Sequence, residues 1–380
     1  MPFFLAFSIV SVAVVAILTK TYVGYGNYSW WTKGGFFLFL LACVGAPFIA
    51  HIIKNNYFDT PMIHLIKVLY FFFGFVFFLF IITILRDFAW TFIDLIKKTP
   101  LEEIKNPPHI NTINLLTMLV TLLVSVYGVY EANKLPRILT YNIESPKIKE
   151  STKVVMLSDL HIDVDVSAKR IADYVEQVNK LNPDVVVLAG DVVDNSYNAL
   201  KLQMEELKKL SPKKGVYVAL GNHEFYSGHF DWVMNFGYMK FNVVGNYGEK
   251  IGNTGLFVGG IPDINSAHQG KMKIIPEGAL YGATKDDYVV ILSHTPKVAK
   301  GFTKDNVDMI LSGHTHGGQV YPFHYFVKQA NEGRLAGFYD VDGIKMYISR
   351  GTRYWGPPMR IGAPSEITVF NFEPKRKTDE

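Results

Sequence analysis

Residues 154–161 read VVMLSDLH, and this short stretch sets a pattern that recurs through the second half of the chain. A run of apolar residues is followed at once by Ser158, Asp159 and His161. Short runs that are apolar throughout are typical of strands buried on both faces of a sheet. The stretch therefore predicts a buried strand whose end carries side chains that can bind a metal ion.

Four later segments repeat this arrangement of an apolar run followed by polar residues. The runs and the residues that follow them are 185–188 with Asp191, 216–220 with Asn222 and His223, 289–292 with His294, and 309–311 with His314 and His316. Loops at the carboxyl ends of strands meet at one edge of an α/β sheet. We therefore expect these side chains to lie together in one crevice.

Helical patterns separate the early apolar runs, near residues 169–180 and 199–210. Further strands are expected at residues 256–259, 345–348 and 367–372. Apolar strands that alternate with helices indicate βαβ units, in which both faces of a sheet are covered. We expect an α/β domain over residues 153–373, followed by a charged tail over residues 374–380.

Each polar cluster has an ordinary explanation when it is taken alone. An Asp-x-His is usually a cap or a turn, and a Gly-Asn-His-Glu is usually a turn. The pair His314 and His316 is a better metal signal, because alternate residues of an extended chain point to the same side. Five clusters at five strand ends are hard to obtain by packing alone. The combination therefore predicts a metal site.

In this order the clusters resemble the motifs of the calcineurin-like metallophosphoesterase family, and segments 317–319 and 349–351 resemble its membrane-associated bacterial branch. The resemblance covers residues 153–373 and implies two packed β-sheets flanked by helices, an αββα order. It also implies two divalent metal ions. One would be held by Asp159, His161 and His316, the other by Asn222, His294 and His314, and Asp191 would bridge them.

Mixed imidazole and carboxylate ligands suit Mn²⁺, Fe or Zn²⁺ better than Mg²⁺ or Ca²⁺, which prefer oxygen alone. No cysteine narrows this choice, because the single cysteine, Cys43, lies in an apolar run of the first half. Two ions about 3.5–4 Å apart can hold a bridging hydroxide that attacks phosphorus, and can clamp the attacking and leaving oxygens. The expected chemistry is hydrolysis of a phosphoester or pyrophosphate bond.

His223 stands beside the ligand Asn222 and resembles the family histidine that does not bind metal. We expect it to protonate the leaving oxygen or to stabilise the transition state. Glu224 either orients this histidine or is an ordinary exposed side chain. Arg350 and Arg353 are candidates for substrate binding, since a guanidinium group donates two hydrogen bonds to a phosphate.

The first half of the chain holds most of the apolar residues, which make up 49% of the whole. Four runs approach the roughly 20 residues that a helix needs to cross a bilayer, at residues 3–18, 36–53, 68–85 and 110–130. A removable signal peptide would mimic the first run, but no basic residue precedes it. We therefore expect a four-helix transmembrane region over residues 1–130 and a multi-pass protein of the bacterial cytoplasmic membrane.

The side of the membrane on which the second half lies is not decided by charge. With four spans, each side collects six Lys or Arg residues close to the membrane, so the positive-inside rule is balanced. Residues 86–98 mix aromatic and charged residues, which fits either a helix at the membrane interface or an extension of the third span. The polar residues 131–152, with two prolines, are predicted to be a linker.

A simple membrane anchor needs only one span, whereas four are expected here. The larger membrane region therefore favours a substrate that is a phospholipid or is lipid-linked. Phe323, Tyr325 and Phe326 follow the His314 and His316 loop, where they would either contact the bilayer or pack beneath the loop. The family includes enzymes that split the pyrophosphate of a nucleotide-linked acylated sugar, which makes such a compound a candidate substrate.

Two alternatives remain open. In one, the spans are only an anchor and the substrate is soluble, for example a cyclic nucleotide. In the other, the protein is a receptor or transporter in which the same fold has lost its activity, although no predicted ligand is missing. The net charge of +4 gives no case for nucleic acid, which usually requires a basic stripe. The sequence does not indicate an oligomeric state.

Overall fold

The chain divides into two compact units, which are described separately. A computed structural model describes residues 2–24, 28–56, 60–100, 109–264, 266, 272–298 and 300–375. Unit 1 consists of Met1–Tyr130 with Gly356–Met359, and unit 2 of Glu131–Trp355 with Arg360–Glu380. The predicted tail falls partly outside the described residues, at positions 376–380.

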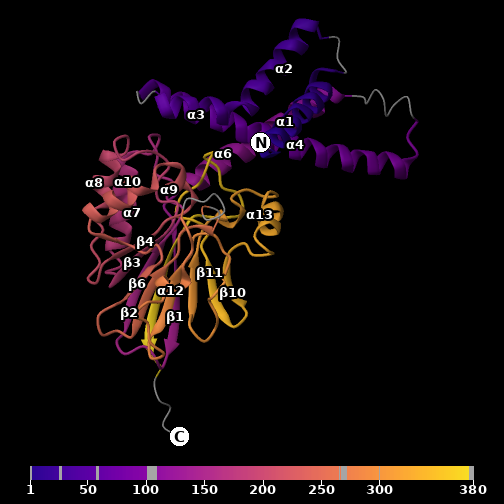
Figure 1. The fold of residues 1–380 in the computed structure, drawn as a ribbon. Coiled ribbons are helices and arrows are strands. Elements are labelled where there is room, and N and C mark those ends of the chain that lie inside the picture. The colour runs from indigo at the N-terminus through magenta and orange to yellow at the C-terminus, as the bar shows by residue number, and fades with distance from the viewer. Residues whose placement is uncertain are drawn as a thin grey trace. The chain divides into compact units, whose positions relative to one another are not determined.

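Unit 2 contains two six-stranded sheets (Figure 1). The first has the order β1 (Arg137–Ser145), β12 (Glu366–Pro374), β2 (Thr152–Leu157), β3 (Val185–Ala189), β4 (Val216–Ala219) and β5 (Phe241–Val243). The second has the order β10 (Gly337–Val341), β11 (Ile344–Ile348), β9 (Met309–Ser312), β8 (Tyr288–Leu292), β7 (Leu256–Gly260) and β6 (Tyr247–Lys250).

The central strands of each sheet run parallel to one another. In the first sheet, β2, β3, β4 and β5 are parallel, whereas β12 is antiparallel to β2. In the second sheet, β7, β8, β9 and β11 are parallel, with antiparallel strands β6 and β10 at the two edges. The parallel strands of each sheet therefore all end on the same side of that sheet, as expected for an α/β architecture.

Helices cover the outer face of the first sheet, and the inner faces of the two sheets pack together. The helices of unit 2 are α7 (Ala168–Asn179), α8 (Lys201–Leu207), α9 (Asn222–Tyr226), α10 (His229–Tyr238), α12 (Pro276–Ala279) and α13 (His324–Ala330). One buried cluster joins both sheets through residues such as Met156, Val187, Val290 and Leu311. Another joins β2 and β3 to α7 and α10, through Ile171, Trp232 and Phe236. The predicted αββα architecture is confirmed.

The strands predicted from apolar runs are all present, including β2, β3, β4, β8 and β9, whose ends carry the metal-binding residues. Their residues are almost fully buried, which explains why they were readable as continuous apolar runs. The strands that the sequence did not indicate, β1, β5, β6 and β10, are short or lie at sheet edges. A strand with one face in solvent carries polar residues on that face, so it does not form a continuous apolar run.

The prediction of a linker over residues 131–152 is wrong. Residues 137–145 form β1, which pairs with β12 along its whole length, and Glu131 onwards belongs to unit 2. Along β1 only Ile143 and Ser145 are buried, because β1 is an edge strand with a partner, β12, on one side alone. The polar residues that suggested a linker are the outward-facing side of this edge strand.

Unit 1 is helical. Its elements are α1 (Pro2–Thr19), a π-helical turn η1 (Lys20–Gly24), α2 (Trp30–Val44), α3 (Ala46–Asn56), α4 (Thr60–Lys97) and α6 (Ile110–Asn133), the last of which runs on into unit 2. Residues 86–97 continue α4 without a break, so this segment is a helical extension of the third predicted span. Whether this part of α4 lies at a membrane interface stays a prediction.

Two helical segments of the described chain, Met62–Lys97 and Ile110–Asn133, are long and apolar enough to cross a membrane. The second predicted span is divided into Trp30–Val44 and Ala46–Lys54, which are bent by 51° and make up to one further span. Gly45 and Pro47 explain this break, because a proline near a helix start cannot continue the preceding hydrogen-bond ladder. The first run forms a shorter apolar helix, Ser8–Gly24. The prediction of four spans thus stays a prediction.

Candidate metal centre

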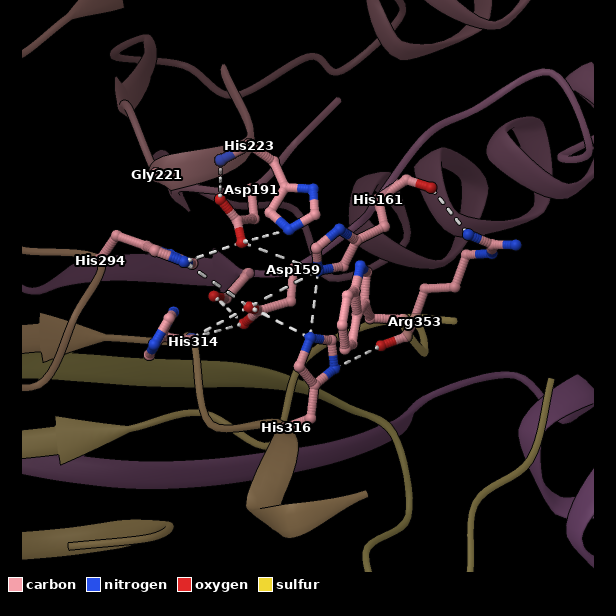
Figure 2. A network of polar contacts seen from close by, with 12 residues as sticks. Asp159, His161, Asp191, Gly221, His223, His294, His314, His316 and Arg353 are labelled. Carbon is pink, nitrogen blue, oxygen red and sulfur yellow. Dashed lines mark hydrogen bonds and ion pairs between the residues drawn. The ribbon is translucent and has the colours of Figure 1, made fainter. Parts of the chain in front are cut away.

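The predicted metal ligands lie together at the edge of the two sheets where β2, β3, β4, β8 and β9 end. We call this edge the metal edge. The residues that follow these strands are Asp159 and His161 after β2, Asp191 after β3, Asn222 after β4, His294 after β8, and His314 and His316 after β9. Figure 2 shows Asp159 and Asp191 in the middle, with His294 and His314 on one side and His161 and His316 on the other.

The first group of ligands is Asp159, His161 and His316. The Nε2 atoms of His161 and His316 are 3.0 Å apart. Asp159 Oδ1 lies 3.5 Å from His316 Nε2 and 4.0 Å from His161 Nε2. Two ligand atoms that are each about 2.1 Å from one ion lie roughly 3.0–3.5 Å apart at the usual angles. The group therefore has the spacing of a metal site.

The second group is Asp191, His294 and His314, whose ligand atoms lie within 4.8 Å of one another. Asp191 Oδ2 is 3.0 Å from His294 Nε2 and 3.8 Å from His161 Nε2, so one carboxylate oxygen faces both groups. Its other oxygen accepts a hydrogen bond from the backbone N–H of His223, at 2.9 Å. This arrangement matches the predicted bridging role of Asp191.

Two buried atoms of predicted metal ligands, Asn222 Oδ1 and His294 Nε2, make no hydrogen bond. Because His294 Nδ1 faces a carbonyl oxygen, the lone pair of its Nε2 points at the carboxylate of Asp191, 3.0 Å away. A buried polar atom without a partner costs roughly 1–3 kcal/mol. A cation at this position would satisfy both atoms, and imidazole, amide and carboxylate donors suit Mn²⁺, Fe or Zn²⁺. The residues present therefore fit a pair of divalent ions.

Backbone carbonyl groups orient two of the histidine ligands. His294 Nδ1 is 2.8 Å from the carbonyl oxygen of Ala189, and His316 Nδ1 is 3.2 Å from that of Arg353. Since a carbonyl group only accepts hydrogen bonds, each Nδ1 carries the proton. The Nε2 lone pair is then free to bind a metal, which is the usual outer-shell arrangement of metal-binding histidines.

Five of the seven ligands have a backbone conformation that is rare for residues other than glycine. The φ angles are +54° at Asp159, +42° at His161, +49° at Asp191, +70° at His314 and +51° at His316. Such a conformation costs on the order of 1–3 kcal/mol per residue and persists where the surroundings impose it, often at functional sites. The strand ends thus turn sharply so that their side chains converge.

Glycine residues let the turns of the metal edge come into contact. A Cβ atom on Gly221 would lie 2.2 Å from Asp191 Oδ1, and one on Gly313 would lie 2.4 Å from Asp159 Oδ2. No side chain fits at such distances, so each position requires glycine for close approach. The glycine that precedes Asn222 and the one that precedes His314 therefore make room for the carboxylates.

His223 lies next to the ligands without belonging to either group of three described above. Its ring centroid is 4.6 Å from that of His161, and its Nε2 is 3.9 Å from Asp191 Oδ2. Its Nδ1 is 2.9 Å from Asp194 Oδ1. Because Asp194 only accepts hydrogen bonds when ionised, the Nδ1 of His223 carries a proton and Nε2 faces the centre.

Asp194 is a functional residue that the sequence did not single out. Its Oδ1 contacts Nδ1 of both His161, at 2.8 Å, and His223, at 2.9 Å. One carboxylate thus orients a metal ligand and the neighbouring histidine. Its position three residues after Asp191 was visible, but the pairing with two histidines from other turns was not.

The carboxylates of Asp191 and Asp194 and the imidazole ring of His223 stabilise one another in their charged forms. Burial disfavours the charged form of His223, but Asp191 and Asp194 outweigh it and raise the pKa of His223 to about 10. Burial likewise opposes ionisation of Asp194, but His161 and His223 hold the pKa of Asp194 well below its usual range. The cluster therefore favours an ionised carboxylate facing protonated nitrogen atoms.

Glu224 is fully buried, so the alternative of an ordinary exposed side chain is wrong, and the alternative that it orients His223 stays a prediction. Its carboxylate accepts hydrogen bonds from the backbone N–H groups of Asp191, Val192, Val193 and Gly221, at 2.6–3.1 Å. It holds the turn after β3 against the turn after β4. Glu224 therefore positions the backbone of Asp191 and Asn222.

The two arginines predicted to bind substrate are engaged by protein groups. Arg350 Nη1 donates to Glu366, at 2.9 Å. Arg353 is almost fully buried and donates to the carbonyl oxygen of His161, at 2.7 Å, and to Asp165, at 3.2 Å. Their contacts do not support the prediction of substrate binding. Arg353 instead holds the backbone of a metal ligand, as Figure 2 shows.

Replacement of Arg353 by Ala is expected to destabilise unit 2 by about 3 kcal/mol, because the buried ion pair with Asp165 and the hydrogen bond to the carbonyl oxygen of His161 would both be lost. Thermal unfolding in detergent should show this loss. The matched control is Lys180→Ala, since Lys180 and its partner Glu176 are 73% and 64% exposed. A normal melting temperature together with a raised KM for a phosphodiester would instead make Arg353 a substrate-binding residue.

Comparison with known proteins agrees with this geometry. The family model for calcineurin-like phosphoesterases matches residues 152–318. An uncharacterised metallophosphoesterase of Campylobacter jejuni is 31% identical over 296 residues, which are 76% of this chain and 77% of the relative. A transmembrane protein with a metallophosphoesterase domain from Danio rerio is 32% identical over 271 residues, which are 67% of this chain and 61% of the relative.

The chain is also similar to a solved dimetal phosphatase from Danio rerio, with 15% identity and a TM-score of 0.35. That match covers 54% of this chain and 89% of the phosphatase chain. The family model spans all seven predicted ligands, from Asp159 to His316, and the match to the Campylobacter relative covers 77% of that protein. The chain therefore belongs to the calcineurin-like phosphoesterase family.

Proposed function

We propose that this protein is a membrane-bound two-metal phosphoesterase that hydrolyses a phosphoester or pyrophosphate bond in a lipid-linked substrate. We place it in the cell membrane as a multi-pass protein. The observation that carries the hydrolytic part is the carboxylate of Asp191, which faces His161 of one ligand group and His294 of the other.

Two divalent ions, when bound, supply a water molecule of lowered pKa and neutralise the charge of the phosphoryl oxygens. Asp159, His161 and His316 would hold one ion, and Asn222, His294 and His314 the other, with Asp191 between them. His223 lies beside this set and is held by Asp194, so its Nε2 is directed to the centre. We assign His223 the donation of a proton to the leaving oxygen.

The first strand of unit 2 begins at the level of its metal edge. Strand β1 runs parallel to β12, and Ile138 is paired with Ile367. Thr368, the next residue of β12, is paired with Met156 of β2, which ends at Leu157. Strand β1 therefore begins at the level where β2 ends, at the metal edge.

The link that leads to this point is short and ordered. Helix α6, which is apolar enough to cross a membrane, ends at Asn133, and β1 begins at Arg137. Arg170 donates to the carbonyl oxygen of Asn133 and Gln177 to that of Pro136, both at 2.7 Å.

The surface of α13 also supports a lipid substrate. Helix α13 follows the His316 turn and has no buried residue. Phe323, Tyr325 and Phe326 are 45%, 68% and 70% exposed. These exposed fractions do not fit the alternative that the three side chains pack beneath the loop of His314 and His316. Exposed aromatic residues of this kind are typical of a surface that contacts lipid.

The direct test measures hydrolysis by the full-length protein in detergent micelles, loaded separately with Mn²⁺, Fe²⁺ or Zn²⁺. One substrate is a nucleotide diphosphate linked to diacylglycerol, and the other is bis-(4-nitrophenyl) phosphate. We expect a higher kcat/KM for the lipid. Efficient hydrolysis of soluble phosphodiesters alone would favour the anchored enzyme with a soluble substrate, and no hydrolysis of either would contradict the proposed activity.

Replacement of Phe323, Tyr325 and Phe326 together by Ser is expected to raise the KM for the lipid substrate at least tenfold. Each side chain would otherwise contribute on the order of 1–3 kcal/mol on entering an apolar phase, and only part of this is realised at an interface. The KM for bis-(4-nitrophenyl) phosphate should stay within about twofold. Initial rates in mixed micelles at several lipid fractions measure both values.

The control variant for this test is Tyr281→Ser. Tyr281 is 83% exposed and lies between α12 and the start of β8, away from the metal edge. It should leave both KM values unchanged. If the triple variant weakens the two substrates equally, α13 contributes to the general structure of the centre, and the support for a lipid from this helix is lost.

A further inference from the structure

Two exposed aromatic rings lie beside His223. The ring centroid of Tyr226 is 5.4 Å from that of His223, and the ring centroid of Trp355 is 6.1 Å from it. Tyr226 is 60% exposed and Trp355 is 54% exposed. Tyr226 belongs to α9, whereas Trp355 belongs to the loop that follows Arg353. The histidine therefore has an aromatic side chain from each of two separate segments next to it.

The position of Trp355 is set by Gln319. The side-chain Nε2 of Gln319 donates to the carbonyl oxygen of Trp355 at 2.8 Å, and the N–H of Trp355 donates to Gln319 Oε1 at 2.9 Å. Gln319 itself has a φ of +50° and donates its N–H to the carbonyl oxygen of His316, at 3.0 Å. This pair of reciprocal hydrogen bonds joins the Trp355 backbone to the turn that carries a metal ligand.

The arrangement uses residues that neither the metal centre nor the proton transfer requires. A large exposed indole ring gains nothing from solvent, and tryptophan and tyrosine are favoured where an apolar surface meets water. Pockets for organic ligands are lined mainly by such rings, together with a few polar groups. Residues 317–319, noted in the sequence as Gly-Gly-Gln, thereby acquire a role at the substrate site.

We propose that Trp355 and Tyr226 form a subsite for an apolar group carried by the leaving alcohol, and that Gln319 positions Trp355 in it. The proposal rests on the proposed function, because it takes His223 as the donor of a proton to the leaving oxygen. The atoms next to that oxygen must then lie beside His223, which both rings adjoin. An alkyl chain or an aromatic ring on the alcohol has the required chemistry.

The test uses two pairs of phosphodiesters with the full-length, metal-loaded protein. In the first pair, methyl phenyl phosphate and methyl 1-naphthyl phosphate, only the leaving alcohol changes, and the two alcohols have similar acidity. In the second pair, methyl 4-nitrophenyl phosphate and 1-naphthyl 4-nitrophenyl phosphate, nitrophenol leaves from both and only the retained group changes. The measured quantity is the ratio of kcat/KM within each pair.

In the first pair, the ratio of kcat/KM for the naphthyl compound to kcat/KM for the phenyl compound defines the naphthyl preference. Trp355→Ala and Tyr226→Ala are each expected to lower this ratio about fivefold to tenfold, the range expected for a lost aromatic contact. The ratio of the second pair should not change. Gln319→Met should shift the first ratio in the same direction, and Trp355→Phe should restore most of it. Metal content should stay at the wild-type value in all four variants, which a general disturbance of the centre would not allow.

A change in the second ratio alone would overturn the proposal, since the rings would then contact the retained group. Unchanged ratios in both pairs would show that the rings do not contact the substrate. In either case the wild-type protein still hydrolyses the compounds, so the proposed function stands. Failure of the wild-type protein on every phosphoester would contradict the proposed function itself.

A third pair, methyl ethyl phosphate and methyl dodecyl phosphate, followed by the release of ethanol or dodecanol, distinguishes the source of the apolar group. A dodecyl preference that is lost in Trp355→Ala indicates the chain of a lipid alcohol. A preference confined to the naphthyl compound indicates an aromatic alcohol. Tyr238→Ala serves as the control for all three pairs, because Tyr238 is 74% exposed but lies at the far end of α10, next to β5.

Discussion

Replacement of Asp191 by Asn is expected to empty at least one metal site and to lower kcat/KM by about 10³-fold. The Oδ2 of Asp191 faces both His294, at 3.0 Å, and His161, at 3.8 Å. Asn can still accept the hydrogen bond from the N–H of His223 through one oxygen, but its NH₂ group cannot bind a cation. The loss corresponds to the several kcal/mol that a metal ion contributes to transition-state stabilisation.

The measurements are the metal content of the purified protein, by mass spectrometry, and the initial rates with excess Mn²⁺. A thermal melt of the same sample shows whether unit 2 is folded. The matched control is Asp173→Asn on α7, since Asp173 pairs only at the surface with Lys169, which is 83% exposed. Two equivalents of metal per chain together with normal turnover in Asp191→Asn would refute the bridging assignment.

Replacement of His223 by Ala is expected to leave both metal sites filled and to lower kcat by about 10²–10⁴-fold for substrates with poor leaving groups. His223 belongs to neither of the two predicted ligand groups, although with His161 and Asp194 it forms a third cluster of side chains that could hold a metal. Its Nδ1 is held by Asp194, so its Nε2 is placed to transfer a proton. The loss should be much smaller for nitrophenyl esters, because nitrophenolate leaves without protonation.

Comparison of two leaving groups in one variant provides an internal control, since any general damage lowers both rates alike. An equal loss for alkyl and nitrophenyl esters would assign His223 to stabilisation of the transition state instead of proton transfer. Loss of metal in His223→Ala would make it a ligand. Asp194→Asn should combine both effects more weakly, because Asp194 contacts His161 as well as His223.

The metal ligands were predictable because each depends on a local pattern. Asp159, Asp191 and His294 follow apolar runs that form β2, β3 and β8. A run buried on both faces of a sheet must be apolar throughout, so its end is visible in the sequence. The carboxyl ends of parallel strands meet at one edge, and this rule brings the residues together without knowledge of the coordinates.

Edge elements were harder to predict. Strand β1 was taken for a linker because its outer face is polar, and only its pairing with β12 identifies it as a strand. Helix α4 is continuous to Lys97, and no local signal distinguished this from a separate helix beyond residue 85. The composition of residues 131–152 does not reveal the pairing of β1 with β12, and the composition of residues 86–97 does not reveal that α4 is unbroken.

By itself, the sequence determined the buried strands of an α/β domain, the polar clusters at five strand ends and the apolar helices of the first half. These follow from burial and from the chemistry of side chains at strand ends, whereas the αββα order and the roles of the seven predicted ligands and of His223 came from the resemblance to the family. The tertiary structure alone decided the roles of Asp194, Glu224 and Arg353. Their partners lie in turns separated by tens to hundreds of residues, and a hydrogen bond depends on where two atoms meet, which no local pattern records.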